Sequence, residues 1–249
     1  MAEAARRFQV SRASACRWLQ AVNGYFSLGL VWVLLVILAL PAPAAEDDVT
    51  LLQQRAIARI DAFVEHFRKT GDFQSRVADL QQAESELTAS NQAFTAHGNW
   101  SAVAQGLVRL GQIQRMRTHW ESALTHYRQA ESTARRANDA ATQARALIGL
   151  AQTEAQLRDY GSVAAHAAQA VNLSEPLADR KLLFDALSVA GQIQVSHGNL
   201  NAAVDTLNRA LAVARELKDE ASLFYSHLDR ADVYFKFARE CDYQGNYES

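Results

Sequence analysis

Three blocks of equal length decide how this chain folds: LVRLGQIQRMRTHWESALTHYRQA at 107–130, LIGLAQTEAQLRDYGSVAAHAAQA at 147–170 and LSVAGQIQVSHGNLNAAVDTLNRA at 187–210. The blocks align without a gap when Leu107, Leu147 and Leu187 are placed in register. Each begins with leucine, has a small residue four positions later and a large apolar residue near its middle, and ends in alanine. Because these columns recur together at a single shift, the blocks predict an internal structural repeat.

The columns have the spacing expected of a helical hairpin. In the second half of the first block, large and small residues recur at i, i+3, i+7 and i+10, which places them on one helix face. The small residues allow close helix approach, and the large residues fill the space between hairpins. The residues that define the repeat are Gly111, Trp120, Ala123, Ala130, Ala151, Tyr160, Ala170, Gly191, Leu200, Ala203 and Ala210, with Leu107, Leu147 and Leu187 at the heads of the blocks.

This order of residues resembles the tetratricopeptide repeat, in which a first-helix Leu-Gly precedes a second-helix aromatic, alanine, aromatic and alanine. In the first block the match is carried by Leu110-Gly111, Trp120, Ala123, Tyr127 and Ala130. The period of about 40 residues exceeds the usual ~34, and the proline that usually ends a repeat is missing. The resemblance implies an all-α, right-handed α-solenoid of antiparallel helix hairpins, with longer second helices as in the extended members of the family.

The repeats predict the domain organisation. Residues 46–249 are expected to form one helical repeat domain, because no segment alternates at period two for long enough to be a strand. Within it we expect a divergent hairpin at 51–100, repeats at 101–140, 141–180 and 181–220, and an incomplete repeat at 221–249. The last helix would have no partner from its own repeat, so it is expected to expose an apolar side and to cause self-association. This side is predicted to hold Val233, Tyr234, Phe237 and Ala238.

Residues 1–45 form a separate segment. Four arginines precede an apolar run that ends at Leu40, and Pro41-Ala42-Pro43-Ala44-Ala45 follows, which is the order of a secretory signal. The run of about 15 residues is shorter than the ~20 that cross a bilayer comfortably. The long basic start leaves an uncleaved anchor, formed by residues 25–40, as the alternative. Both predict a domain on the periplasmic or extracellular side, either cleaved and soluble or attached to the membrane through this segment alone.

Processing at this segment gives the first testable prediction. If the signal is cleaved, the exported protein should begin at or close to Ala45, because Ala42-Pro43-Ala44 has the small residues of a cleavage site. Intact-mass measurement of the exported protein would then show the loss of residues 1–44. Met1 retained in a membrane pellet would contradict cleavage and support the anchor.

The same segment offers a DNA-binding alternative. Residues 4–19 resemble the helix-turn-helix of transposase-like proteins, with Gln9 where that family usually places a turn glycine. This alternative predicts a cytoplasmic protein with neither cleavage nor export. Without the four arginines and one glutamate of residues 1–45, the whole-chain charge of −2 becomes about −5. Because basic and acidic residues are interleaved after Glu46, we expect no nucleic-acid partner.

The sequence lacks the common signatures of catalytic sites, which favours a non-enzymatic protein. The seven histidines contain no i, i+4 pair suited to a metal, and no glycine-rich phosphate loop or G-x-S-x-G sequence occurs. Cys241 is the single cysteine after residue 45, so it has no second cysteine for an intramolecular disulfide. We therefore expect no enzymatic activity, no metal and no cofactor.

The resemblance implies a binding groove lined by first-helix side chains, which would hold extended or helical segments of a protein partner. By register the groove residues are Arg109, Gln112, Arg115, Met116, Arg145, Gln152, Gln156, Asp185 and Gln192, accompanied by Gln105, Ser188 and Val195. Glutamine recurs at 112, 152 and 192, and its amide both donates and accepts hydrogen bonds. These glutamines could follow a peptide backbone, or they could simply be polar helix formers in solvent. The predicted function is a protein-protein interaction scaffold; the alternative is the regulatory arm of a longer enzyme, such as a caspase-like peptidase.

Overall fold

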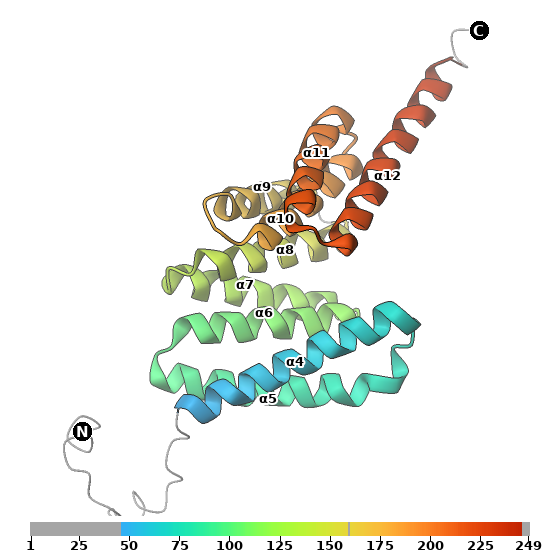
Figure 1. Ribbon diagram of the computed structural model, residues 1–249. Coiled ribbons are helices and arrows are strands. Elements are labelled where there is room, and N and C mark those ends of the chain that lie inside the picture. The colour runs from blue at the N-terminus through green and yellow to red at the C-terminus, as the bar shows by residue number, and fades with distance from the viewer. Residues whose placement is uncertain (1–45, 159, 246–249) are drawn as a thin grey trace, which may run out of the picture. The chain divides into compact units, whose positions relative to one another are not determined.

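The computed structural model describes residues 46–158 and 160–245, so the signal or anchor predicted within residues 1–45 lies outside the described part. The described residues form α-helices joined by short turns, with one 3-10 turn and no strand (Figure 1). The predicted all-α class is therefore confirmed for this part of the chain. The helices are α4 (Glu46–Thr70), α5 (Val77–His97), α6 (Trp100–Met116), α7 (Trp120–Arg136), α8 (Ala140–Leu157), α9 (Tyr160–Ser174), α10 (Arg180–Ser196), α11 (Leu200–Leu217) and α12 (Glu220–Gly245), and the 3-10 turn is η1 (Gln74–Arg76).

Consecutive helices pack as hairpins. The closest pairs include α4 with α5, α6 with α7, α8 with α9 and α10 with α11, and α12 packs against α11. The first helices α6, α8, α10 and α12 also contact one another in order along the array. Extensive contacts join helices at most two positions apart, which is the arrangement of a linear repeat array.

The small residues on the first helices match the residues that cross them. Tyr127 of α7 is 2% exposed, and its ring lies against the bare backbone at Gly111 of α6 and Gly149 of α8. A Cβ atom would lie 2.8 Å from the Tyr127 ring if added at Gly111 and 2.3 Å from it if added at Gly149. These two glycines therefore make room for an aromatic side chain between neighbouring hairpins.

The same pairing recurs in the third repeat, where Gly191 of α10 faces Leu207 of α11. A Cβ atom at Gly191 would lie 2.4 Å from Leu207 Cδ2. In the second repeat both equivalent positions, Ala151 and Ala167, hold alanine, and both are buried. The first helix thus has glycine where the facing second-helix residue is large, and alanine where the facing residue is small. Tyr160 begins α9, and its side chain lies outside the described residues.

The first helices share a capping feature that the sequence analysis missed. Asn99, Asp139, Asp179 and Asp219 occupy the same position of successive repeats, and each accepts a hydrogen bond from a backbone N–H in the first turn of the helix it precedes. Each also forms a hydrogen bond or an ion pair with a side chain of the preceding first helix. The contacts are Asn99 Nδ2 to Glu46 Oε1 at 3.3 Å, Ser101 Oγ to Asp139 Oδ2 at 2.6 Å, Arg145 Nη2 to Asp179 Oδ2 at 2.6 Å, and Lys181 Nζ to Asp219 Oδ2 at 3.6 Å. One residue therefore both begins a helix and ties it to the previous repeat.

The exposed side of α12 differs from the prediction. Val233 is fully buried against Leu200, Ala203 and Leu207, and Phe237 packs against the same cluster, so these two residues form the contact with α11. Tyr234 and Ala238 are exposed, as expected. The prediction was wrong for Val233 and Phe237 because it did not establish which side of the helix α11 occupies.

The apolar residues left exposed on α12 form another stripe, which we call the α12 face: Phe224, Leu228, Ala231 and Phe235. Phe224 and Phe235 are 65% and 63% exposed. Their equivalents one repeat earlier, Phe184 and Val195, are 4% and 5% exposed. The α12 face thus corresponds to a side of the first helix that is buried in the preceding repeat.

Candidate functional site

Side chains of the first helices converge on one groove. A cavity of about 570 Å³ is lined from α4, α6, α7, α8, α10 and α12, so it crosses the repeats. Most predicted groove residues line it: Arg109, Gln112, Arg115, Arg145, Gln152, Asp185, Ser188 and Gln192. Apolar side chains lie between these polar ones, among them Val108, Ile148 and Phe184.

Four predicted residues do not line this groove. Met116 is partly buried and packs against the apolar cluster of the first hairpin, and Val195 is buried in the cluster between α10, α11 and α12. Gln156 is exposed near the end of α8. Gln105 is exposed on α6, where its Nε2 donates a hydrogen bond to Ser101 Oγ at 3.4 Å. Met116 and Gln156 share one column of the repeat, one helical turn after Gln112 and Gln152. The groove therefore ends one turn earlier on α6 and α8 than the repeat register predicted.

The groove also contains residues that the sequence analysis missed. Tyr225 and Asp229 of α12 line it together with Arg68 of α4 and Lys181 of α10. Tyr225 and Asp229 stand one repeat after Asp185 and Val189, so the repeat register could have found them. Arg68 has no such signal, because α4 belongs to the divergent first hairpin.

The three recurring glutamines line the same groove but make different contacts. Gln112 accepts a hydrogen bond from Arg109 Nη1 at 3.0 Å, and Gln192 donates one to Asp229 Oδ1 at 2.9 Å. Gln152 lies on α8, the helix between the two. The Gln112 nitrogen and the Gln192 oxygen take no part in these two bonds, so each amide retains one polar group for a ligand.

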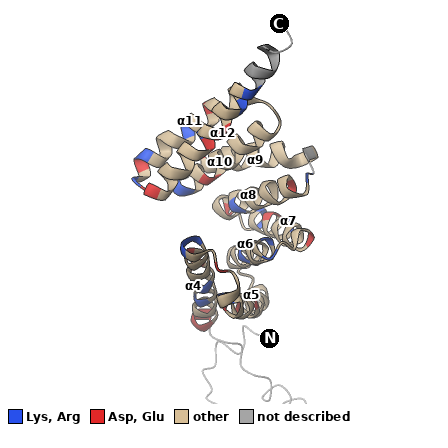
Figure 2. Cartoon of the chain, turned by 90° about the vertical axis from the view of Figure 1, so that its right-hand side faces the viewer, with Lys and Arg blue, Asp and Glu red and all other residues tan. Residues whose placement is uncertain are grey.

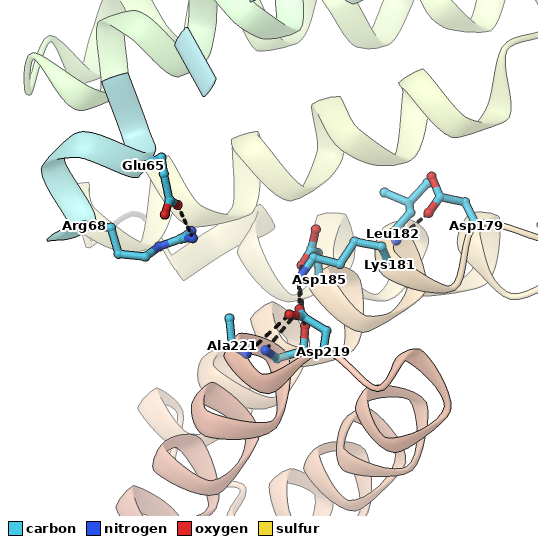
Figure 3. A network of polar contacts seen from close by, with 9 residues as sticks. Glu65, Arg68, Asp179, Lys181, Leu182, Asp185, Asp219 and Ala221 are labelled. Atoms are coloured by element: carbon cyan, nitrogen blue, oxygen red, sulfur yellow. Dashed lines mark hydrogen bonds and ion pairs between the residues drawn. The ribbon is translucent and has the colours of Figure 1, made fainter. Parts of the chain in front are cut away.

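Ion pairs hold several of the charged side chains that line the groove. Arg109 pairs with Asp61 at 3.2 Å, and Arg145 pairs with the cap residue Asp179 at 2.6 Å. Lys181 lies between Asp185, at 3.5 Å, and Asp219, at 3.6 Å (Figure 3). Across the described helices, basic and acidic residues are interspersed (Figure 2). The groove is therefore mixed in charge.

Two charged side chains in the groove lack an oppositely charged partner. Among the described residues no carboxylate lies within 4.0 Å of Arg115, and its buried Nε has no acceptor. Asp229 accepts the Gln192 bond at Oδ1, whereas its buried Oδ2 has no hydrogen-bond donor. Burial raises the pKa of Asp229, and burial likewise raises the pKa of Asp185 despite its pairing with Lys181.

The described part of the chain has neither a membrane-spanning helix nor a group of three potential metal ligands. Within residues 46–158 and 160–245, no helix combines the length and apolar character needed to span a bilayer. The same residues bring no three His, Cys, Asp or Glu side chains together as a metal site.

Comparison with known proteins places this fold among helical-repeat proteins. No family model and no curated protein matches the sequence. The crystal structure of BtubC (BKLC) from P. vanneervenii is similar, with a TM-score of 0.57 and 15% identity over 78% of this chain and 84% of BtubC. Rap protein complexed with Competence and Sporulation Factor is similar with a TM-score of 0.55 and 18% identity over 73% of this chain. The matched region spans about half of Rap, 54% of its chain. The described helices therefore form a helical-repeat solenoid.

Proposed function

We propose that this chain is a non-enzymatic interaction scaffold of the tetratricopeptide-repeat type, with repeats extended beyond the usual length. Its groove binds an extended or helical segment of a protein partner. The observation that carries this proposal is the convergence of first-helix polar residues from three successive repeats on one cavity of about 570 Å³. Rap protein, whose fold is similar, has been crystallised in a complex with Competence and Sporulation Factor.

The lining of the groove suits a polypeptide segment. Gln112, Gln152 and Gln192 offer amides to the backbone of a ligand at intervals set by the repeat, while Val108 and Ile148 offer apolar contacts to its side chains. Such a lining combines sequence-tolerant backbone recognition with a few charged groups that give selectivity. We further propose that the domain works on the outer side of the cytoplasmic membrane, because the basic and apolar order of residues 1–45 is that of an export signal.

Replacement of Gln112, Gln152 and Gln192 by alanine tests the groove. The triple variant should keep most of its melting temperature, since the better helix propensity of alanine offsets part of the loss of the Gln112–Arg109 and Gln192–Asp229 hydrogen bonds, worth about 0.5–1.5 kcal/mol each. Peptides selected from a random phage-displayed library on the unaltered chain should bind the variant about tenfold or more weakly. Each lost hydrogen bond to a backbone is worth roughly 0.5–1.5 kcal/mol. Fluorescence anisotropy with the selected peptides measures this change.

The matched control replaces three exposed second-helix glutamines by alanine: Gln81 of α5, Gln129 of α7 and Gln169 of α9. Gln129 and Gln169 are themselves one repeat apart, and none of the three lines the groove. The control should bind the selected peptides with unchanged affinity. If the groove triple variant stays folded and binds the peptides as tightly as the control, the binding surface lies elsewhere.

A further inference from the structure

The charges that line the groove change sign along the array. Arg109 on α6 and Asp229 on α12 occupy the same column of the repeat, with Gly149 and Val189 between them. In a second column Arg145 on α8 is followed by Asp185 on α10. Both columns are thus basic in the earlier repeats and acidic in the later ones.

The basic part of the groove contains a cation without an anion. Arg115 of α6 forms a side-chain hydrogen bond with Tyr127, but no ion pair joins it to a described carboxylate, whereas Arg109 and Arg145 each have an aspartate partner. Its buried Nε has no acceptor in the described part of the chain. A buried, unpaired guanidinium N–H is costly, and a ligand carboxylate would satisfy it through a charge-assisted hydrogen bond.

The acidic part contains an anion without a cation. Asp229 has the amide of Gln192 as its donor and a second carboxylate, Asp232, on its own helix, and no described Lys, Arg or His forms an ion pair with it. Its Oδ2 is buried, and no described residue donates a hydrogen bond to it. An ammonium or guanidinium group of a ligand would therefore pair with the Asp229 carboxylate.

Between these two charges the groove is lined by neutral groups and by charges that are already paired, Arg145 with Asp179 and Lys181 with Asp185. The neutral residues Gln152 and Ile148 lie on α8, and Ser188 lies on α10 with a buried hydroxyl that has no hydrogen-bond partner among residues 46–158 and 160–245. Lys181 is the exception to the acidic end, but Asp185, Asp219 and Ser222 already hold its ammonium group. It therefore does not compete for a ligand carboxylate as Arg115 does.

We propose that the groove is bipolar and selects a protein segment by the order of its charges. A carboxylate of the segment binds Arg115 at the α6 end, and a cationic side chain binds Asp229 at the α12 end, with the neutral stretch of the segment across Gln152 and Ser188. This proposal rests on the proposed function, since it names the class of segment that the same groove binds. Each terminal contact pairs a partly buried charge that has no oppositely charged partner among the described residues.

Synthetic fluorescent peptides of one composition and different charge order test the proposal on the full chain, kept soluble in a non-ionic detergent. The bipolar peptide has glutamates in one half and lysines in the other, and the alternating peptide has the same residues in mixed order. Two further peptides keep only the glutamates or only the lysines, with glutamine at the other charged positions. We expect the bipolar peptide to bind about tenfold tighter than the alternating one, with the difference shrinking at high salt.

Two variants separate the ends of the groove. Arg115→Gln should weaken the bipolar and glutamate-only peptides severalfold and leave the lysine-only peptide unchanged. Asp229→Asn should do the reverse, weakening the bipolar and lysine-only peptides. The controls are Arg128→Gln and Asp205→Asn, which remove exposed charges outside the groove on α7 and α11 and should change no affinity. A merely structural role for Arg115 or Asp229 would weaken all peptides alike.

The outcomes distinguish this inference from the proposed function. Equal binding of the bipolar and alternating peptides would overturn the charge order and leave a groove that binds peptides. Uniform weakening of all peptides by Arg115→Gln or Asp229→Asn would overturn the assignment of the two ends. Failure of the unaltered chain to bind any of the four peptides, while it binds the peptides selected from the library, would overturn the inference alone; failure to bind either set would overturn the proposed function as well.

Discussion

Replacement of Tyr127 by alanine is expected to lower the free energy of unfolding by about 3–5 kcal/mol, the range for deleting a large buried aromatic side chain. Tyr127 is 2% exposed and fills the slot between Gly111 of α6 and Gly149 of α8, so no nearby Cβ can move into the space it leaves. Urea unfolding followed by circular dichroism measures the loss. Tyr127→Phe is the matched control, because it keeps the ring and should lose far less stability.

Gly149→Ala tests the same slot from the opposite side. In the unaltered chain the new Cβ would lie 2.3 Å from the Tyr127 ring, so overpacking should destabilise the fold by about 1–3 kcal/mol. In the Tyr127→Ala background the clash is absent, and the better helix propensity of alanine should stabilise the fold by about 0.5–1 kcal/mol. The effect of Gly149→Ala on the free energy of unfolding therefore changes sign between the two backgrounds. Stabilisation by Gly149→Ala in both would show that the ring does not constrain this position.

We expect this chain to self-associate through the α12 face, and glutamate at both Phe224 and Phe235 to make it a monomer. We propose that the α12 face pairs with the same face of a second copy, because its residues recur at alternating four- and three-residue spacing, the pattern of helix pairs in coiled coils. Burial of each exposed phenylalanine would contribute about 1.5–3 kcal/mol. Sedimentation equilibrium of residues 46–249 over a range of concentrations measures the association.

The control for this experiment places glutamate at Asn201 and Asn208, two exposed positions of α11, so that it adds the same charge away from the α12 face. The control should associate as the unaltered segment does. An unaltered segment that remains monomeric at the highest concentrations reached would contradict pairing through the α12 face.

The repeat columns predicted most of the packing because packing in this array is local. Gly111 and Gly191 were predicted from their column, and each faces a large second-helix residue. Gly149 was not predicted, because its column holds Arg109 and Val189 in the neighbouring repeats. Its role arises only from the way in which Tyr127 reaches across two first helices.

The groove was predictable only within the repeats. Register placed Gln112, Gln152 and Gln192 on one surface, where they all line the cavity. It could not place Arg68, because the position of α4 at the groove depends on how successive hairpins stack in space. Nor could it decide which side of α12 is covered, since the pattern of a first helix does not indicate which neighbours are present. The predictions for residues 1–45 stay predictions.

The capping residues make each repeat block a transferable unit. In residues 101–140, 141–180 and 181–220 the donor stands near the beginning of the block and its aspartate near the end: Ser101 with Asp139, Arg145 with Asp179, and Lys181 with Asp219. The aspartate then caps the first helix of the following block. A duplicated block would therefore bring its own tie to the next block, so gene duplication can lengthen the array by whole units. Each added unit would extend the groove by one first helix and allow a longer segment to be recognised.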